Sequence, residues 1–177
     1  MFVKKDKSGF IVVKENNRVL LQKIYSMTFS ETGLNKNIQK AITDLGFDTP
    51  TPIQQESIPY LLENTNDLIA LAQTGTGKTA AFGLPVLHKI DVERKIPQAI
   101  ILCPTRELCL QIAKDMETYA KYTKGLKITA VYGGASIMPQ IKSLKSGTQI
   151  VVGTPGRVID LINRKSLKLQ DIEFVVL

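Results

Sequence analysis

The sequence predicts an α/β domain in which a parallel sheet is flanked by helices, and three observations lead to this prediction. From Asp67 onward, short apolar runs rich in β-branched residues alternate with segments of helical periodicity. Runs that are apolar at nearly every position are typical of strands buried on both faces, and the alternation is typical of βαβ crossovers. The length of 177 residues, 44% of them hydrophobic, suits one well-packed domain.

The runs that we expect to form strands follow one another at regular intervals. They are "DLIALA" from Asp67, "AIILCP" from Ala99, "KITAVYG" from Lys127, "QIVVG" from Gln149 and "EFVVL" from Glu173. Between the second and third runs, Leu108, Ile112, Met116 and Tyr119 recur at helical spacing. Each strand is therefore expected to be joined to the next by a helix, as a parallel sheet requires.

Two segments precede this core. Residues 27–66 are predicted to be helical from Ser30 to Leu62, with breaks at residues 46–52, "GFDTPTP", and at Pro59, because proline and the residue before it resist helix. Residues 1–26 form an extension of unknown role, in which residues 9–23 are a plausible β-hairpin. We therefore divide the chain into residues 1–26, 27–66 and 67–177.

Charge and cysteine content restrict the class of protein. The net charge of +7 suits a polyanion such as nucleic acid, and an ordinary lysine-rich surface remains the alternative. The sequence contains neither an apolar run of about 20 residues nor a signal core at its start, which predicts a cytoplasmic protein without membrane contact. Cys103 and Cys109 are expected to be buried, and His88 to lie on a helix surface.

A glycine-rich turn follows the first apolar run, within "LAQTGTGKTAAF" from Leu71. The pattern is that of a phosphate-binding loop with Ala72 in place of the first glycine. We expect a strand over residues 68–72, a tight turn over 74–77 and a helix over 78–90. Glycines at 75 and 77 would let backbone N–H groups converge on a phosphate, with Lys78 reaching the β and γ phosphates and Thr79 ligating Mg²⁺. A plain turn would not require lysine followed by threonine, but kinases, GTPases, transporters and helicases all use such a loop.

Other motifs flank the loop. Upstream, "GFDTPTPIQ" ends at Gln54, whose amide can pair with the N6 and N7 edge of adenine, and Phe47 can stack on a base. Downstream, "PTREL", "YGG" and "GTPGR" each follow a predicted strand. Ligands bind beyond the carboxyl ends of such strands, so these turns and the phosphate loop are expected to share one edge. Taken singly, each motif is also compatible with an ordinary turn or helix start.

In this order and spacing, "GFDTPTPIQ", "AQTGTGKT", "PTREL", "GG" and "TPGR" resemble the first ATPase domain of DEAD-box RNA helicases over residues 29–177. The resemblance implies a RecA-like fold and ATP-dependent unwinding or remodelling of RNA, with ATP and Mg²⁺ as cofactors and a monomer as the working form. It also accounts for Ala72, because the family commonly begins its phosphate loop with alanine.

The resemblance assigns roles to individual residues. It implies that ATP is bound by Phe29, Phe47, Gln54, Thr74, Gly75, Thr76, Gly77, Lys78 and Thr79, of which Lys78 and Thr79 are catalytic and Thr79 holds Mg²⁺. It implies that the RNA backbone is bound by Pro104, Thr105, Arg106, Glu107, Gly133, Gly134, Thr154, Pro155, Gly156 and Arg157. Backbone contacts predict little sequence preference and a strong salt dependence.

The family's acidic motif, its Ser-Ala-Thr segment and its second domain would all follow Leu177. We therefore expect this chain alone to bind ATP and RNA without turnover, and to fold poorly because an interior strand would be missing. Two alternatives stay open at this point: a non-catalytic nucleotide- and RNA-binding domain, and another P-loop enzyme in which "PTREL" and "TPGR" are accidental.

Overall fold

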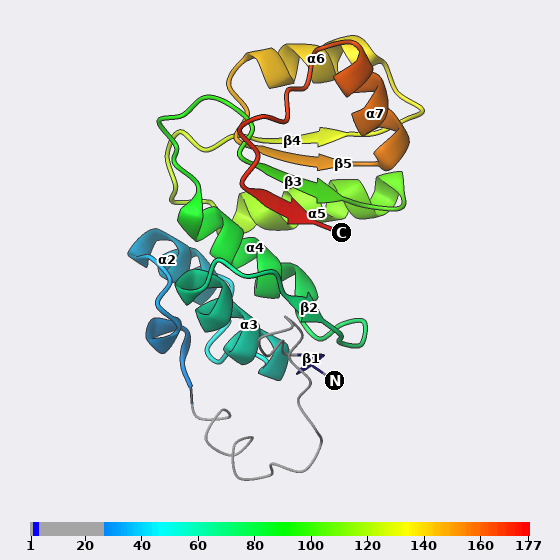
Figure 1. Ribbon diagram of the computed structural model, residues 1–177. Helices are drawn as coiled ribbons and strands as arrows, with labels where there is room; N and C mark the ends of the chain where they lie inside the picture. The colour runs from blue at the N-terminus through cyan, green and yellow to red at the C-terminus, as the bar shows by residue number, and fades with distance from the viewer. Residues whose placement is uncertain (1, 4–26) are drawn as a thin grey trace. The chain divides into compact units, whose positions relative to one another are not determined.

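A computed structural model describes Phe2, Val3 and residues 27–177 of the chain (Figure 1). The hairpin predicted over residues 9–23 lies outside the described residues. The chain divides into two compact units, Met1–His88 and Lys89–Leu177.

The first unit consists mainly of helices. Its elements are β1 (Phe2–Val3), the 3-10 helix η1 (Phe29–Thr32), α2 (Lys36–Asp44), α3 (Pro52–Glu63), β2 (Ile69–Ala70) and α4 (Lys78–Lys89). Asn35 caps α2, because its side-chain oxygen accepts the Ile38 N–H at 3.1 Å. The predicted break over residues 46–52 is confirmed, since α2 ends before it and α3 begins with proline at its first position.

The predicted break at Pro59 is wrong, because α3 continues through that residue to Glu63. A proline inside a helix removes one backbone hydrogen bond and costs about 3 kcal/mol. The packing of α3 outweighs this cost: Ile58 is fully buried, and the Ser57 hydroxyl lies 2.6 Å from the Ile53 carbonyl oxygen and 3.2 Å from that of Ala81. The side chain of Ser57 thus ties α3 to α4.

The first predicted strand is shorter than expected and differently paired. Only Ile69 and Ala70 form β2, which pairs antiparallel with β1 and is not part of the parallel sheet. Ile69 and Leu71 are about half exposed, at 49% and 53%. The apolar run therefore predicted a strand correctly. It predicted the burial of that strand wrongly, because burial depends on the neighbouring strands and not on the run itself.

The second unit contains the sheet that the sequence predicts. Its elements are β3 (Ala99–Leu102), α5 (Arg106–Tyr119), β4 (Ile128–Val131), α6 (Ile137–Lys145), β5 (Ile150–Gly153), α7 (Pro155–Asn163) and β6 (Phe174–Val176). The strand order is β4-β5-β3-β6 and every pairing is parallel. In Figure 1 the sheet lies between α5 on one face and α6 with α7 on the other. The predicted strands at these runs, and the α/β class, are confirmed.

The core of this unit forms where α6 and α7 cover the sheet. Leu144 of α6 and Val158 and Leu161 of α7 pack against Val131 and Val151. Helix α5 lies against β4 and β5 from the other face, and there the Cys109 thiol donates to the Val152 carbonyl oxygen at 3.1 Å. Both cysteines are buried as predicted, and burial raises the pKa of the Cys109 thiol to about 11.

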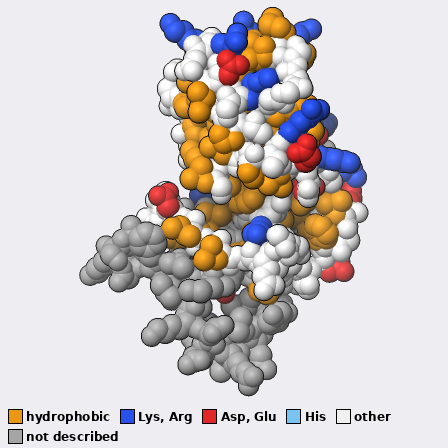
Figure 2. Space-filling model, turned by 90° about the vertical axis from the view of Figure 1, so that its right-hand side faces the viewer, with side chains coloured by type: hydrophobic (Ala, Val, Ile, Leu, Met, Phe, Trp, Pro, Cys, Tyr) orange, Lys and Arg blue, Asp and Glu red, His pale blue; other side chains and the backbone are white. Residues whose placement is uncertain are grey.

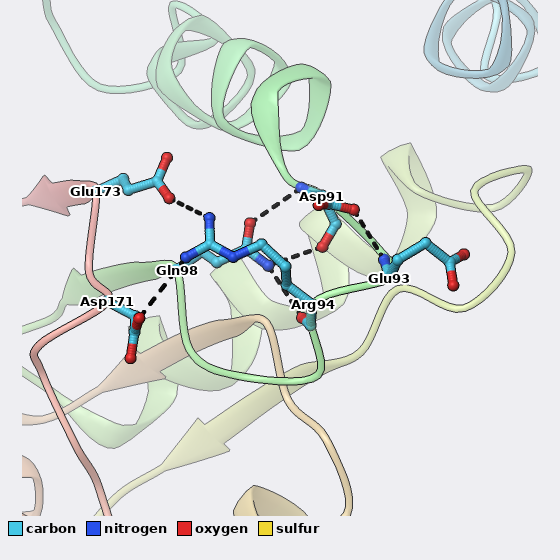
Figure 3. Close-up of polar contacts among 6 residues, drawn as sticks. All are labelled: Asp91, Glu93, Arg94, Gln98, Asp171 and Glu173. Carbon is cyan, nitrogen blue, oxygen red and sulfur yellow. Dashed lines mark hydrogen bonds and ion pairs between the residues drawn. The ribbon is translucent and has the colours of Figure 1, made fainter.

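Two buried glutamines, Gln98 and Gln149, hold the loops at the amino-terminal ends of the strands, and Figure 3 shows the contacts of Gln98. The Gln98 amide accepts the Asp91 N–H at 3.0 Å and donates to the carbonyl oxygens of Asp91 and Arg94. Arg94 in turn forms ion pairs with Asp171 and Glu173 on the segment that leads into β6. Gln149 acts similarly, accepting the Lys127 N–H and donating to two loop carbonyl oxygens.

His88 also has a structural contact that the sequence did not indicate. It lies in α4, partly buried, and its Nδ1 accepts the backbone N–H of Asn35 at 3.1 Å. The contact joins the start of α2 to α4 and requires a lone pair on Nδ1. None of the helices in residues 27–177 is long and apolar enough to cross a membrane.

We expect Gly153→Ala to destabilise the chain by about 1–3 kcal/mol through overpacking. A methyl group at position 153 would lie 2.5 Å from a Val158 methyl carbon and 2.7 Å from one of Val131, both in the core. Urea unfolding measures the loss. Gly156→Ala is the matched control, since a methyl group there meets nothing within 4 Å, and an equal effect of both changes would contradict the packing argument.

Candidate nucleotide and nucleic-acid sites

The predicted phosphate loop joins β2 to α4 with the expected backbone conformation. Gly75 and Gly77 have φ values of +79° and +84°, in the left-handed region that favours glycine. Helix α4 begins directly afterwards at Lys78, so its first N–H groups adjoin the turn. The local structure therefore matches the strand, glycine turn and helix that a phosphate site requires.

Helix α3 braces this loop from the Gln54 side. The Thr51 hydroxyl donates to the Thr76 carbonyl oxygen at 2.8 Å, and the Gln54 amide nitrogen donates to the Gly77 carbonyl oxygen at 3.1 Å. The amide oxygen of Gln54 accepts the Thr51 N–H at 2.9 Å, which forms the capping box of α3. The segment that ends at Gln54 and the phosphate loop are thus joined directly by hydrogen bonds.

The predicted adenine-binding residues differ in their exposure. Gln54 is only 4% exposed, and both of its amide atoms bond within the protein. Phe47 lies in the loop before α3 and is 43% exposed, whereas Phe29 is buried in η1. Phe47 is therefore accessible to a planar base, while Gln54 braces the loop and its contact with adenine remains a prediction.

The Lys78 side chain reaches back to the start of the phosphate loop. Its ammonium group donates to the Ala72 carbonyl oxygen at 2.9 Å, and the Thr76 hydroxyl donates to the Gln73 carbonyl oxygen at 2.7 Å. The first position of the motif thus contributes its carbonyl group, which alanine provides as well as glycine does. Because Lys78 is exposed, its ammonium group can exchange this carbonyl oxygen for a phosphate oxygen.

Three predicted RNA-binding turns meet at the carboxyl edge of the second unit's sheet. Residues 104–107 follow β3, residues 133–134 follow β4 and residues 154–157 follow β5. The strands end level, because Gly153 pairs with Leu102 on one side and with Val131 on the other. The prediction that these turns share an edge is confirmed. The phosphate loop belongs to the other unit, so its place at this edge stays a prediction.

Both arginines of these turns are held against the segment that follows β4. The Arg106 guanidinium lies 4.8 Å from the centre of the Tyr132 ring. One terminal nitrogen of Arg157 donates to the Ala135 carbonyl oxygen at 2.9 Å, and its other terminal nitrogen is buried without a hydrogen-bond partner among the described residues. A buried guanidinium nitrogen without a partner is costly, and an anion would satisfy it.

The threonines of the two helix-starting turns are not equivalent. The Thr105 hydroxyl oxygen accepts the Leu108 N–H at 3.2 Å and so caps α5. Thr154 precedes α7 in the same way, but its side chain makes no capping hydrogen bond. The N–H groups in the first turn of α7 are therefore free of a side-chain cap and face the same edge as Arg157.

Charge is distributed unevenly over this side of the molecule. Figure 2 views it from the side toward which the strands β3, β4 and β5 point in Figure 1, and Lys and Arg side chains gather at its top, near α6. Exposed Lys142 and Lys145 lie in the last turn of α6, at its end away from the turn that follows β4. The glycine and threonine groups of the turns are uncharged, so Arg106 and Arg157 provide the positive charge within them.

Sequence reasoning missed the residues that support the turns. The motif "YGG" indicates no role for Tyr132, yet the Tyr132 ring lies under Arg106. Gln140 of α6 belongs to none of the motifs, although it bonds to both main-chain polar groups of Tyr132, at 3.2 and 3.1 Å. One signal was present: Gln140 shares a helical face with Ile137 and Leu144, where an apolar residue is expected.

Comparison with known proteins identifies the family. Residues 51–177 match the model of the DEAD/DEAH box helicase family. The chain belongs to this family.

Individual relatives and solved structures support the assignment to this family. The chain is 51% identical to an ATP-dependent RNA helicase DeaD of Haemophilus influenzae and 53% identical to an ATP-dependent RNA helicase CshA of Listeria monocytogenes, over 85% and 84% of its length. It covers 24% and 28% of those two proteins, about a quarter of each. Its fold matches a crystal structure of a DEAD box protein from Methanococcus jannaschii with a TM-score of 0.78 and 45% identity, over 84% of this chain and 40% of that one. Dbp5 of Saccharomyces cerevisiae, bound to RNA and ADP BeF3, matches with a TM-score of 0.76 and 36% identity, over 84% of this chain and 37% of that one. The RecA-like fold implied by the sequence motifs is confirmed.

We expect Gly77→Ala to destabilise the first unit more than Gly75→Ala does. Both changes force alanine into a positive φ, at a cost of about 1 kcal/mol. At Gly77 the new methyl group would also lie 2.2 Å from the Gln54 amide nitrogen, whereas at Gly75 it meets nothing within 4 Å. Gln54 would have to move and lose its bond to the loop. Urea unfolding of both variants measures the difference, and equal losses would show that Gln54 does not brace the loop.

Proposed function

We propose that this chain supplies an ATP-binding and RNA-binding part of an ATP-dependent RNA helicase. The observation that carries the proposal is the meeting of three turns, with their N–H groups, hydroxyls and two arginines, at one sheet edge of a chain that also contains a braced phosphate loop. For the whole protein we propose that ATP hydrolysis drives the unwinding or remodelling of RNA.

In the nucleotide site, the proposed roles follow from the local geometry. The N–H groups of Thr74 to Lys78 surround the phosphates, and the positive end of the α4 dipole adds to their attraction for an anion. Lys78 leaves the Ala72 carbonyl oxygen to reach the β and γ phosphates. Because a hydroxyl oxygen suits a hard cation, Thr79 in the first turn of α4 would hold Mg²⁺, which neutralises charge on the phosphate oxygens.

Recognition of the base is assigned to the segment before α3. Phe47 stacks on adenine, consistent with its exposure, and Gln54 pairs with the adenine edge. Phe29 is buried within the same unit and is proposed to support the base-binding region from inside the core. Selection of ATP over GTP would then depend on Gln54.

At the carboxyl edge, the proposed partner is the sugar-phosphate backbone of RNA. Backbone N–H groups at Gly133, Gly134 and Gly156 and the hydroxyls of Thr105 and Thr154 are suited to phosphate and sugar oxygens. The Arg157 guanidinium beside the uncapped start of α7 is proposed to attract a phosphate, and its buried nitrogen must become exposed to reach one. Pro104, Glu107 and Pro155 complete the same turns and shape their surface.

The comparisons support the proposal. The relatives bear the names of ATP-dependent RNA helicases, and the Dbp5 structure holds RNA and ADP BeF3. A nucleotide- and RNA-binding domain without catalysis is the alternative function. Measuring RNA-stimulated ATP hydrolysis in the whole protein separates the two, because hydrolysis that RNA does not stimulate, or none at all, would refute the helicase proposal.

We expect Lys78→Ala to weaken ATP binding by about tenfold or more, the cost of losing a charge-assisted hydrogen bond to phosphate. Titration of the chain with a fluorescent ATP analogue and Mg²⁺ measures the affinity. Lys89→Ala is the control, because Lys89 is the last residue of the same helix. Unchanged affinity in a folded Lys78→Ala variant would contradict the assignment of the phosphate loop.

We expect RNA binding to weaken as the salt concentration rises. We expect Arg157→Gln to lower the slope of log affinity against log salt concentration by about 0.7, because the loss of one phosphate contact on a single strand has this effect. Fluorescence anisotropy with single-stranded RNAs of unrelated sequence measures affinity and sequence preference together. Arg164→Gln is the control, since Arg164 follows the other end of α7 and pairs with Asp160 in solvent. If both arginine variants lower the slope equally, the edge is not the binding site.

A further inference from the structure

We propose that Gln140 is a positioning residue for RNA binding, because its amide fixes the main chain of Tyr132 and through it the RNA-binding turn at Gly133 and Gly134. The inference rests on the proposed RNA-binding function and adds a residue that lies outside the turns. Gln140 is on α6 and is 8% exposed, so it cannot itself contact RNA without a rearrangement.

The Gln140 amide bonds to Tyr132 as a residue of an additional strand would, on the side of β4 that faces away from β5. β4 is one of the two edge strands of the sheet, and the Lys127 and Val131 carbonyl oxygens both accept N–H groups from the β5 side. In a parallel pair alternate residues face the neighbouring strand, so the polar groups of Tyr132 face away from β5. Gln140 satisfies both of them, accepting the Tyr132 N–H at 3.2 Å and donating to the Tyr132 carbonyl oxygen at 3.1 Å.

The contact between Gln140 and Tyr132 lies directly before the turn at Gly133 and Gly134, so it affects the conformation of that turn. Tyr132 is the last residue before Gly133 and Gly134, which carry no side chains that hold them in place. Gly134 has a φ of +73°, and a methyl group added there would lie 3.9 Å from a terminal nitrogen of Arg106. A rotation of the Tyr132 peptide groups would redirect the N–H groups of both glycines.

Tyr132 also couples Gln140 to Arg106. The Tyr132 ring lies under the Arg106 guanidinium at 4.8 Å, so the main-chain position fixed by Gln140 determines where that ring supports the charge. At the far end of the turn, Arg157 holds the Ala135 carbonyl oxygen at 2.9 Å. The turn is therefore fixed at both ends, by an amide from α6 and a guanidinium from α7.

The chemistry of the residue supports a positioning role over simple packing. Gln140 occupies the face of α6 that also carries Ile137 and Leu144, which pack in the core. A leucine or methionine there would fill space without the cost of burying an amide. Glutamine offers a donor and an acceptor in fixed relation, which an apolar side chain cannot replace.

The first test compares Gln140→Met with wild type, since methionine keeps the length of the side chain and loses both hydrogen bonds. We expect RNA affinity of the folded chain to fall roughly tenfold, with ATP affinity unchanged. Gln149→Met is the matched control: Gln149 is fully buried and bonds three main-chain groups where Gln140 bonds two, but at the amino-terminal ends of the strands. We expect it to lower stability without changing RNA affinity.

The second test uses Gln140→Glu and pH. In this variant the ionised carboxylate accepts the Tyr132 N–H but repels the Tyr132 carbonyl oxygen, whereas the protonated carboxyl has one donor and one acceptor, as the glutamine amide has. The ratio of variant to wild-type RNA affinity is therefore expected to be low at neutral pH and to rise as pH falls through the pKa of that carboxyl. A constant ratio would overturn the positioning role, and this test also serves if Gln140→Met does not fold.

A third measurement keeps this inference separable from the proposed function. Amide hydrogen exchange of Tyr132, read without RNA, is expected to be slow in wild type and faster in Gln140→Met, with Lys127 unaffected. If wild type does not bind RNA, the proposed function fails, and the role of Gln140 with it. If wild type binds RNA and folded Gln140→Met binds it equally well, only the positioning role is refuted.

Discussion

The parallel pairing of β5 with β4 on one side and β3 on the other determines most of what the second unit can do. All four residues of β5 are buried, and a shift by one residue would exchange its two faces against the helices that cover them. The ends of three strands are therefore level, and the segments that leave them emerge at one edge. Glycines and threonines follow these strands, where a long side chain would cover the N–H groups that face solvent. The charge then comes from two arginines that are held in place by the turn after β4.

Buried glutamines recur in both units as residues whose side-chain amides hold loops in place. Gln98 and Gln149 hold loops at the amino-terminal ends of the strands, Gln140 holds the turn after β4, and Gln54 holds the phosphate loop. In each case a side-chain amide bonds to main-chain groups as a neighbouring strand would. The amide is polar enough to satisfy a loop and uncharged, so its burial costs far less than burial of a lysine or glutamate.

The hydrogen bonds of these buried glutamines could not be predicted from the sequence, whereas other features of the fold could. Apolar runs and helical periodicity located β3 to β6 and their helices, because both patterns follow from local geometry and burial. The motifs located the turns and the phosphate loop for the same reason. The pairing of β2, the continuity of α3 through Pro59 and the bonds of Gln54 and Gln140 depend on tertiary contacts, which no local pattern records.

The Gln54 side chain can hold the phosphate loop and also pair with adenine as proposed. Its amide has a second hydrogen and a second lone pair beyond the two bonds that brace the loop, so the chemistry allows it to pair with adenine without abandoning either. Its exposure of 4% does not yet allow a base to reach those positions. If Gln54 reads adenine as proposed, the base must uncover it, and the movement acts directly on the Gly77 carbonyl group. Adenine recognition and the shape of the phosphate loop would then be coupled through a single amide, with no other contact required.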